Sequence, residues 1–139
     1  MTAPDAIVAY VDGGARGNPG PAGYGVRIET PDGALVEEVC ESIGVATNNV
    51  AEYRGLLAAL EWARAHGCRR VHVRSDSLLL VQQMLGRYRV KSPGLQPLHA
   101  KAQLLASEIG HVGFEHVRRE LNANADRLAN TAMDSAARP

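Results

Sequence analysis

Four acidic residues lie at positions where α/β proteins often carry functional sites: Asp12, Glu52, Asp76 and Asp126. Each comes just after a predicted strand or near the start of a predicted helix. The runs before Asp12 and Asp76 predict two strands that can lie side by side and parallel, which would bring these two acids together. Glu52 and Asp126 would arrive on helices packed against the sheet. We therefore expect the four acids to form one site.

A cluster of four acids favours metal-dependent chemistry. Like charges at close range are costly unless cations neutralise them. Mg²⁺ takes oxygen ligands and shares its shell with substrate phosphates. Two such ions about 3.5–4 Å apart can activate a water and stabilise the leaving oxygen of a phosphodiester. No Cys/His zinc set and no Ser-His-Asp arrangement competes in the sequence, so the hypothesis is phosphodiester hydrolysis.

Each acid also has a purely structural alternative. Asp12, with two glycines after it, could stand in a solvated turn. Glu52 could complete a capping box that starts at Asn49, and Asp76 could cap the helix that follows it. Asp126 could stabilise the dipole of the last helix. The residues alone leave these alternatives open.

The spacing of apolar residues predicts the elements that must position the acids. Strands are expected at 7–11, 24–30, 34–43, 70–75 and 112–117, and helices at 47–66, 77–85, 98–109 and from 122 onward. Residues 13–21 are expected to form a glycine- and proline-rich loop. The fold class is therefore α/β, with a five-stranded mixed sheet flanked by helices. Strands 1 to 3 form an antiparallel meander, and strands 4 and 5 run parallel to strand 1.

Length and composition set limits on the class of protein. A chain of 139 residues that is 45% hydrophobic can form one domain, expected at 1–134, with 135–139 as a tail or the start of a linker to a further domain. Fifteen basic and fifteen acidic side chains cancel, so the net charge gives no general attraction to nucleic acid. No apolar run approaches membrane-spanning length. We expect a cytoplasmic monomer with no membrane partner.

Several motifs together resemble type 1 ribonuclease H over nearly the whole chain. They are Tyr10-Val11-Asp12-Gly13-Gly14 with Gly17-Asn18-Pro19-Gly20, Thr47-Asn48-Asn49-Val50-Ala51-Glu52, Ser75-Asp76-Ser77, and Asn122-Ala123-Asn124-Ala125-Asp126-Arg127-Leu128-Ala129. The resemblance implies the ribonuclease H-like fold and an endonuclease that cuts the RNA strand of RNA–DNA hybrids with two Mg²⁺ ions, for which Mn²⁺ can substitute. The expected products carry 5′-phosphate and 3′-hydroxyl ends.

The same resemblance implies roles for individual residues. The four acids would bind the metals and act in catalysis, with Gly13 beside the metals. The residues implied to contact the hybrid are Gly13, Asn18, Thr47, Asn48, Asn49 and Asn122. Amide side chains can bond base edges and ribose 2′-hydroxyls in a shallow minor groove. A glycine at position 13 would let the hybrid backbone come close to the metals.

The chain resembles the variety of the family that lacks a basic protrusion, because only residues 86–97 join two of its helices. Three basic residues in this connection, Arg87, Arg89 and Lys91, would substitute for the protrusion in part. Arg119 is the candidate for the mobile cation that assists catalysis in such relatives. His116 is its rival, although its parity with Val112 and Phe114 indicates a packed strand residue.

Two other functions stay open at this stage. The chain could be another two-metal nuclease of the same superfold that acts on DNA, because a fold alone does not determine the substrate. It could also be a hybrid-binding module without catalytic activity, in which the acids serve only as caps.

Overall fold

Five strands form one mixed sheet with the order β3-β2-β1-β4-β5 in the computed structural model, which describes residues 4–137. The strands are β1 (Ala6–Ala15), β2 (Gly20–Glu29), β3 (Leu35–Ala46), β4 (Arg70–Ser75) and β5 (His111–His116). The β1–β2 and β2–β3 pairs are antiparallel, while β4 pairs parallel with both β1 and β5. The predicted fold class and topology are confirmed.

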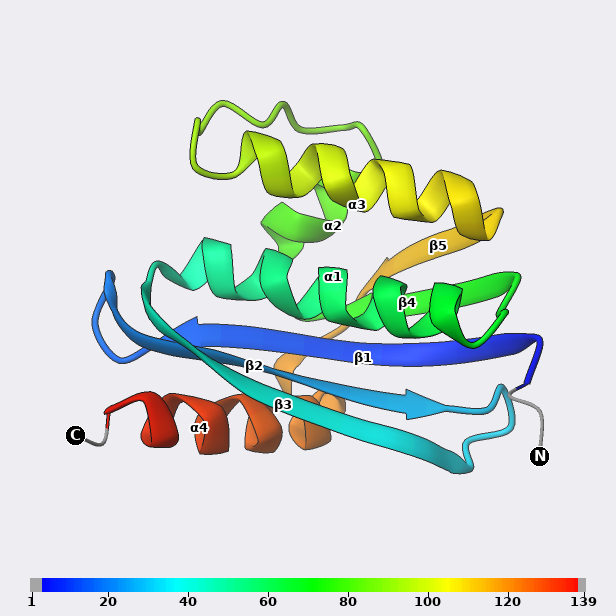
Figure 1. Ribbon diagram of the computed structural model, residues 1–139, viewed down its shortest axis with the longest axis horizontal. Helices are drawn as coiled ribbons and strands as arrows, with labels where there is room; N and C mark the ends of the chain where they lie inside the picture. The colour runs from blue at the N-terminus through cyan, green and yellow to red at the C-terminus, as the bar shows by residue number, and fades with distance from the viewer. Residues whose placement is uncertain (1–3, 138–139) are drawn as a thin grey trace.

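Helices cover both faces of this sheet, as Figure 1 shows. They are α1 (Asn48–Ala65), α2 (Leu78–Met84), α3 (Gln96–Ile109) and α4 (Ala123–Ala137), with a short 3-10 turn, η1 (Arg119–Leu121), before α4. The first three helices lie on one side of the sheet, and α4 lies on the other side, against β1, β2 and β3. Buried apolar residues of β1, β2, β4 and α1 form the main core.

The first two strands are longer than the sequence predicted. Residues 13–15 and 20–21 pair as strand, although a glycine- and proline-rich loop was expected at 13–21, and residues 22–23 extend β2 ahead of the strand predicted at 24–30. Packing accounts for two glycines of β2: a Cβ on Gly23 or Gly25 would overlap atoms of Ala132 or Leu128 in α4. These glycines therefore let α4 lie close to β2.

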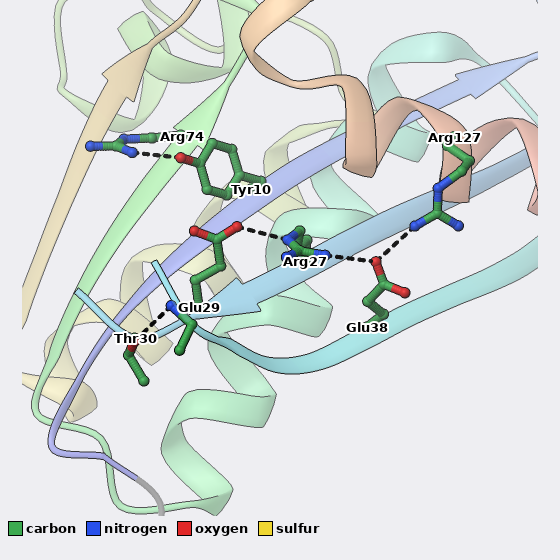
Figure 2. A network of polar contacts seen from close by, with 8 residues as sticks. Tyr10, Arg27, Glu29, Thr30, Glu38, Arg74 and Arg127 are labelled. Carbon is green, nitrogen blue, oxygen red and sulfur yellow. Dashed lines mark hydrogen bonds and ion pairs between the residues drawn. The ribbon is translucent and has the colours of Figure 1, made fainter. Parts of the chain in front are cut away.

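Polar side chains occupy part of the sheet face on which α4 packs, where that helix does not cover the strands. Arg27 contacts Glu29 at 2.7 Å and Glu38 at 3.3 Å, and Arg127 of α4 reaches the same Glu38 at 2.8 Å (Figure 2). Figure 2 also shows Arg74 of β4 reaching across to the hydroxyl of Tyr10. The Arg127–Glu38 pair thus links α4 to β3 one residue after Asp126.

The ends of two helices differ from the sequence prediction. The structure starts α3 at Gln96, with Pro97 in its first turn, where the fixed φ of proline is favourable. The last helix continues to Ala137, past Ser135 where the predicted tail or linker begins, and residues 138–139 lie outside the described residues. No helix in the described part of the chain combines the length and apolar character needed to cross a membrane.

Candidate active site

Asp12 and Asp76 come together because of the register of two parallel strands. The last residues that β1 and β4 pair with each other are Val11 and Ser75, and each acid is the next residue in the sequence. Asp12 is only 7% exposed and Asp76 is half-buried. The predicted juxtaposition is confirmed, although β1 itself continues past Asp12 in its pairing with β2.

Glu52 joins them from the second turn of α1, where that helix crosses β1. A Cβ built on Gly13 would lie 2.6 Å from the backbone nitrogen of Glu52 and would overlap the carbonyl of Ala51. The helix and the strand thus touch backbone to backbone at this point. Gly13 is therefore required by this contact between helix and strand, a packing role that the sequence did not predict.

The capping alternatives for two of the acids are wrong. Thr47 is the N-cap of α1, since its Oγ1 accepts the Val50 N–H at 3.2 Å. Ser77 caps α2 in the same way, accepting the Leu80 N–H at 3.2 Å. Glu52 and Asp76 are therefore not needed as caps, and both carboxylates turn toward Asp12.

Oxygen atoms of Asp12, Glu52 and Asp76 all lie within 4.8 Å of one another. Glu52 Oε2 is buried and has no hydrogen-bond partner among the described residues, which is costly for a carboxylate oxygen. A set of carboxylate oxygens with an unpartnered buried member fits a hard divalent cation. Asp126 is outside this group of three but lines the same cleft.

The pKa values of the acids reflect this crowding. Burial, with the nearby charges of Asp76 and Asp126, raises the pKa of Asp12 to about 8. Burial and the charge of Asp12 raise the pKa of Glu52 well above its ordinary value. Burial also raises the pKa of Asp76, while the positive charge of Arg119 acts to lower it. The site therefore disfavours its own negative charges, which bound cations would relieve.

A cleft of about 720 Å³ opens above the acids. One wall comes from the end of β5 and from η1, and it includes His116, Arg118 and Arg119. His116 is exposed, so the prediction of a packed strand residue is wrong: it is the last residue of β5, on the wall of the cleft. The structure thus brings both candidates for the assisting group, Arg119 and His116, to the site.

Two of the amides predicted to contact substrate, Asn18 and Asn48, are linked through hydrogen bonds to backbone N–H groups. Asn18 Oδ1 accepts the backbone N–H of Asn48 at 3.0 Å, and Asn48 Oδ1 accepts that of Ala15 at 2.8 Å. Among the described residues, no hydrogen bond uses either NH₂ group. Asn48 lines the cleft, while Thr47 and Asn49 are exposed beside it and do not line it.

Asn122 does not belong with these amides. It is 1% exposed, and its Nδ2 donates to the carbonyl oxygen of Val11 at 2.9 Å. The interpretation of Asn122 as a substrate contact is therefore wrong in this structure. The residue joins the start of α4 to β1, next to Asp12.

Several residues that line the cleft were not among the predicted site residues, and they include Arg16, Arg118, Glu120, Asn130 and Met133. Asn130 lies four residues after Asp126, so helical spacing alone could have placed it on the same face of α4. Arg16 lies in the segment that was interpreted as a loop. Its place in the cleft depends on the shape of the turn between β1 and β2, which the sequence pattern does not predict.

Comparison with known proteins gives a consistent result. The family model described as "Reverse transcriptase-like" matches residues 10–132. The chain is 52% identical to the bifunctional protein Rv2228c of Mycobacterium tuberculosis over 94% of its own length and 36% of that protein. It is 42% identical to ribonuclease HI of Halobacterium salinarum, over 94% of this chain and 65% of that protein. The chain thus spans about a third of the length of the mycobacterial relative.

Solved structures agree with these sequence matches. The N-terminal RNase H domain of Rv2228c superposes with a TM-score of 0.93 at 50% identity, covering 96% of this chain and 97% of that one. RNase H1 of H. salinarum gives a TM-score of 0.90 at 41% identity, covering 94% and 98%. LC11-RNase H1, solved in complex with an RNA/DNA hybrid, gives 0.89 at 47% identity, again covering 94% and 98%. With its fold, its acidic site and these relatives, the chain belongs to the type 1 ribonuclease H family.

Proposed function

We propose that this domain hydrolyses the RNA strand of RNA–DNA hybrids in a metal-dependent reaction that leaves 5′-phosphate and 3′-hydroxyl ends. The observation that carries the proposal is the set of three carboxylates within 4.8 Å of one another at the floor of a cleft, with Glu52 Oε2 buried and unpartnered. The hybrid bound to the related LC11-RNase H1 supports the choice of substrate.

The acids would hold two Mg²⁺ ions, or Mn²⁺ in their place: Asp12, Glu52, Asp76 and Asp126, with Gly13 adjoining through its backbone. When bound, such ions lower the pKa of a water and stabilise the charge on the leaving 3′ oxygen. The backbone N–H of Gly13 lowers the pKa of both Asp12 and Glu52, so it favours the charged carboxylates that a cation needs.

Asp12 would be a firmly placed metal ligand, because β1 is paired on both sides up to Val11. Arg119 would hold a phosphate at the wall of the cleft or help product release. A guanidinium keeps its proton in proteins, so Arg119 cannot act as a general base. In this assignment the acids bind the metals, and Arg119 binds the negative charge of the substrate.

The amides of Asn18, Asn48 and Asn49, with Thr47 beside them, would contact the hybrid. The carbonyl sides of Asn18 and Asn48 already bond to backbone N–H groups. Their NH₂ groups would then donate to minor-groove acceptors or ribose 2′-hydroxyls. Recognition of the 2′-hydroxyl would distinguish the RNA strand from the DNA strand.

A cleavage assay tests the proposal. Labelled RNA–DNA hybrid, DNA duplex and RNA duplex are incubated with the protein and Mg²⁺, Mn²⁺ or EDTA. We expect hybrid cleavage that requires metal and that falls by at least about 100-fold in Asp76→Asn, a loss of a metal ligand. Glu108→Gln is the matched control, because Glu108 is an exposed acid paired with Arg64 between α1 and α3.

Other outcomes of the assay decide against the proposal. Preferential cleavage of DNA duplex would indicate a DNA nuclease of the same superfold. Metal-dependent hybrid binding without cleavage would indicate a binding module. The domain extent of 1–134, a monomeric state, a cytoplasmic location and a further C-terminal domain stay predictions. A longer relative such as Rv2228c is compatible with such a domain.

A further inference from the structure

Arg16 stands on the wall of the cleft in a turn whose backbone is fixed. Its N–H donates to the carbonyl oxygen of Pro21 at 2.8 Å, closing the turn between β1 and β2. A Cβ on Gly20 would overlap the carbonyl of Arg16, so the two backbone segments touch directly. The guanidinium therefore extends from a firmly held position beside the acidic site.

The partner of Arg16 is Asp134 of α4, one residue beyond Met133, which also lines the cleft. Arg16 Nη2 lies 2.8 Å from Asp134 Oδ1, and the two side chains are 45% and 62% exposed. An exposed pair of this kind contributes about 0–1 kcal/mol, because water screens it. The pair can therefore open at little cost when a stronger anion is offered.

We propose that Arg16 is a contact for a backbone phosphate of the nucleic acid in the cleft, and that Asp134 pre-orients the guanidinium and competes with the phosphate for it. This inference rests on the proposed function, because it assumes a nucleic acid in the cleft. A guanidinium bonds a phosphate with two parallel N–H groups, which a single carboxylate contact through Nη2 leaves possible.

The alternative is a purely structural role, in which the ion pair holds the β1–β2 turn against α4. The two roles predict opposite signs for one substitution. If the role is structural, Arg16→Ala and Asp134→Asn both loosen the turn and both weaken binding. If Asp134 competes with phosphate, Asp134→Asn frees the guanidinium and tightens binding, while Arg16→Ala weakens it.

The experiment measures binding of labelled RNA–DNA hybrid by fluorescence anisotropy in EDTA over a series of KCl concentrations. Four proteins are compared: wild type, Arg16→Ala, Asp134→Asn and the double variant. The charge-matched controls are Arg64→Ala and Glu108→Gln, from an ion pair of similar exposure far from the cleft. These controls report the effect of net charge alone.

We expect Arg16→Ala to weaken binding roughly 3- to 10-fold and to reduce the slope of log K against log[salt] by about 0.9, the value for one phosphate contact. Asp134→Asn should tighten binding, and the double variant should match Arg16→Ala. Equal weakening by both single variants, or a change no larger than in the controls, would overturn the proposal.

A second measurement identifies the phosphate. Hybrids with a single neutral methylphosphonate linkage are bound by wild type and Arg16→Ala, and one position should abolish the difference between the two proteins. If every position leaves the difference intact, Arg16 contacts no phosphate. Parallel titrations with DNA duplex separate the two hypotheses: a protein that prefers DNA duplex refutes the proposed function, and the Arg16 assignment is then decided by the same signs on that ligand.

Discussion

The Nδ2 of Asn122 donates to the carbonyl oxygen of Val11 at 2.9 Å, and this hydrogen bond joins the start of α4 to β1. Val11 immediately precedes Asp12. The carbonyl of Asn122 in turn accepts the backbone N–H of Asp126 at 3.0 Å. One buried side chain therefore connects the backbone segments that carry two of the four acids.

Removing this bond should affect both stability and metal use. Asn122→Ala removes the side-chain donor to the Val11 carbonyl in a buried position, which we expect to cost about 1–3 kcal/mol of unfolding free energy. Because Asp126 loses its anchor to β1, the Mg²⁺ concentration for half-maximal cleavage should rise. Urea unfolding and a Mg²⁺ titration of hybrid cleavage measure the two effects.

The control for this prediction is Ser42→Ala. Ser42 Oγ donates to the carbonyl oxygen of Ala132 at 2.6 Å, so it also anchors α4, at a point farther along the helix than Asp126. This variant should lose stability without a change in the Mg²⁺ requirement. An equal shift of the Mg²⁺ midpoint in both variants would show that Asn122 contributes only stability.

Two adjacent glycines should respond very differently to alanine. A Cβ at Gly13 would overlap backbone atoms of Ala51, which cannot yield without moving α1. At Gly14 it would meet the flexible end of Met133, at 3.2 Å from Cε, and Asn48 Oδ1 at an ordinary contact distance of 3.7 Å. We expect Gly13→Ala to lower the thermal midpoint strongly, and Gly14→Ala to change it little. Calorimetry decides, and a well-folded Gly13→Ala would contradict the packing role.

The sequence allowed the topology and the meeting of Asp12 with Asp76 to be predicted, because both depend on strand periodicity and on the usual connection rules. It did not predict that residues 13–15 and 20–23 pair as strand, or that Gly23 and Gly25 let α4 lie close to β2. Glycine has the same composition signal in a loop and in a close helix–strand contact. Only the tertiary neighbours, Leu128 and Ala132, distinguish the two cases.

Residues at the ends of elements were the hardest to assign. His116 shares the parity of Phe114, yet β5 ends there and the side chain opens into the cleft. Asn122 matches a substrate-contact motif in type but is buried by the close approach of α4 to β1. The spacing of residues along the chain does not show where a strand ends, and it does not show which two elements pack closely together.

Arg119 and His116 can be separated by their effects on pH dependence. The charge of Arg119 acts to lower the pKa of Asp76, so its loss should raise that pKa and move the acidic limit of hybrid cleavage to higher pH. We expect Arg119→Gln to show this shift with a roughly 10-fold loss of rate, and Arg119→Lys to restore the limit. If His116→Ala produces the shift and Arg119→Gln does not, the assignment is wrong.

Burial of Asp12 should make the metal-free protein less stable as pH rises. Its pKa is raised to about 8 from an ordinary value of 3.8, mainly by burial and by the charge of Asp76. Between these values the folded protein binds more protons than the unfolded chain, so the unfolding free energy falls with increasing pH. The burial of Glu52 acts in the same direction.

Thermal unfolding in EDTA from pH 5 to pH 8 measures this effect. We expect the wild-type midpoint to fall across that range, and Mg²⁺ to restore it at pH 8 by neutralising the carboxylates. Asp12→Asn removes one titrating charge, so it should flatten the profile and stabilise the metal-free protein at pH 8 by on the order of 2 kcal/mol. Glu108→Gln, an exposed acid outside the site, should leave the profile as in wild type. A wild-type midpoint that rises with pH would mean that Asp12 is already ionised without metal. Repulsion among the carboxylates would then not destabilise the metal-free site.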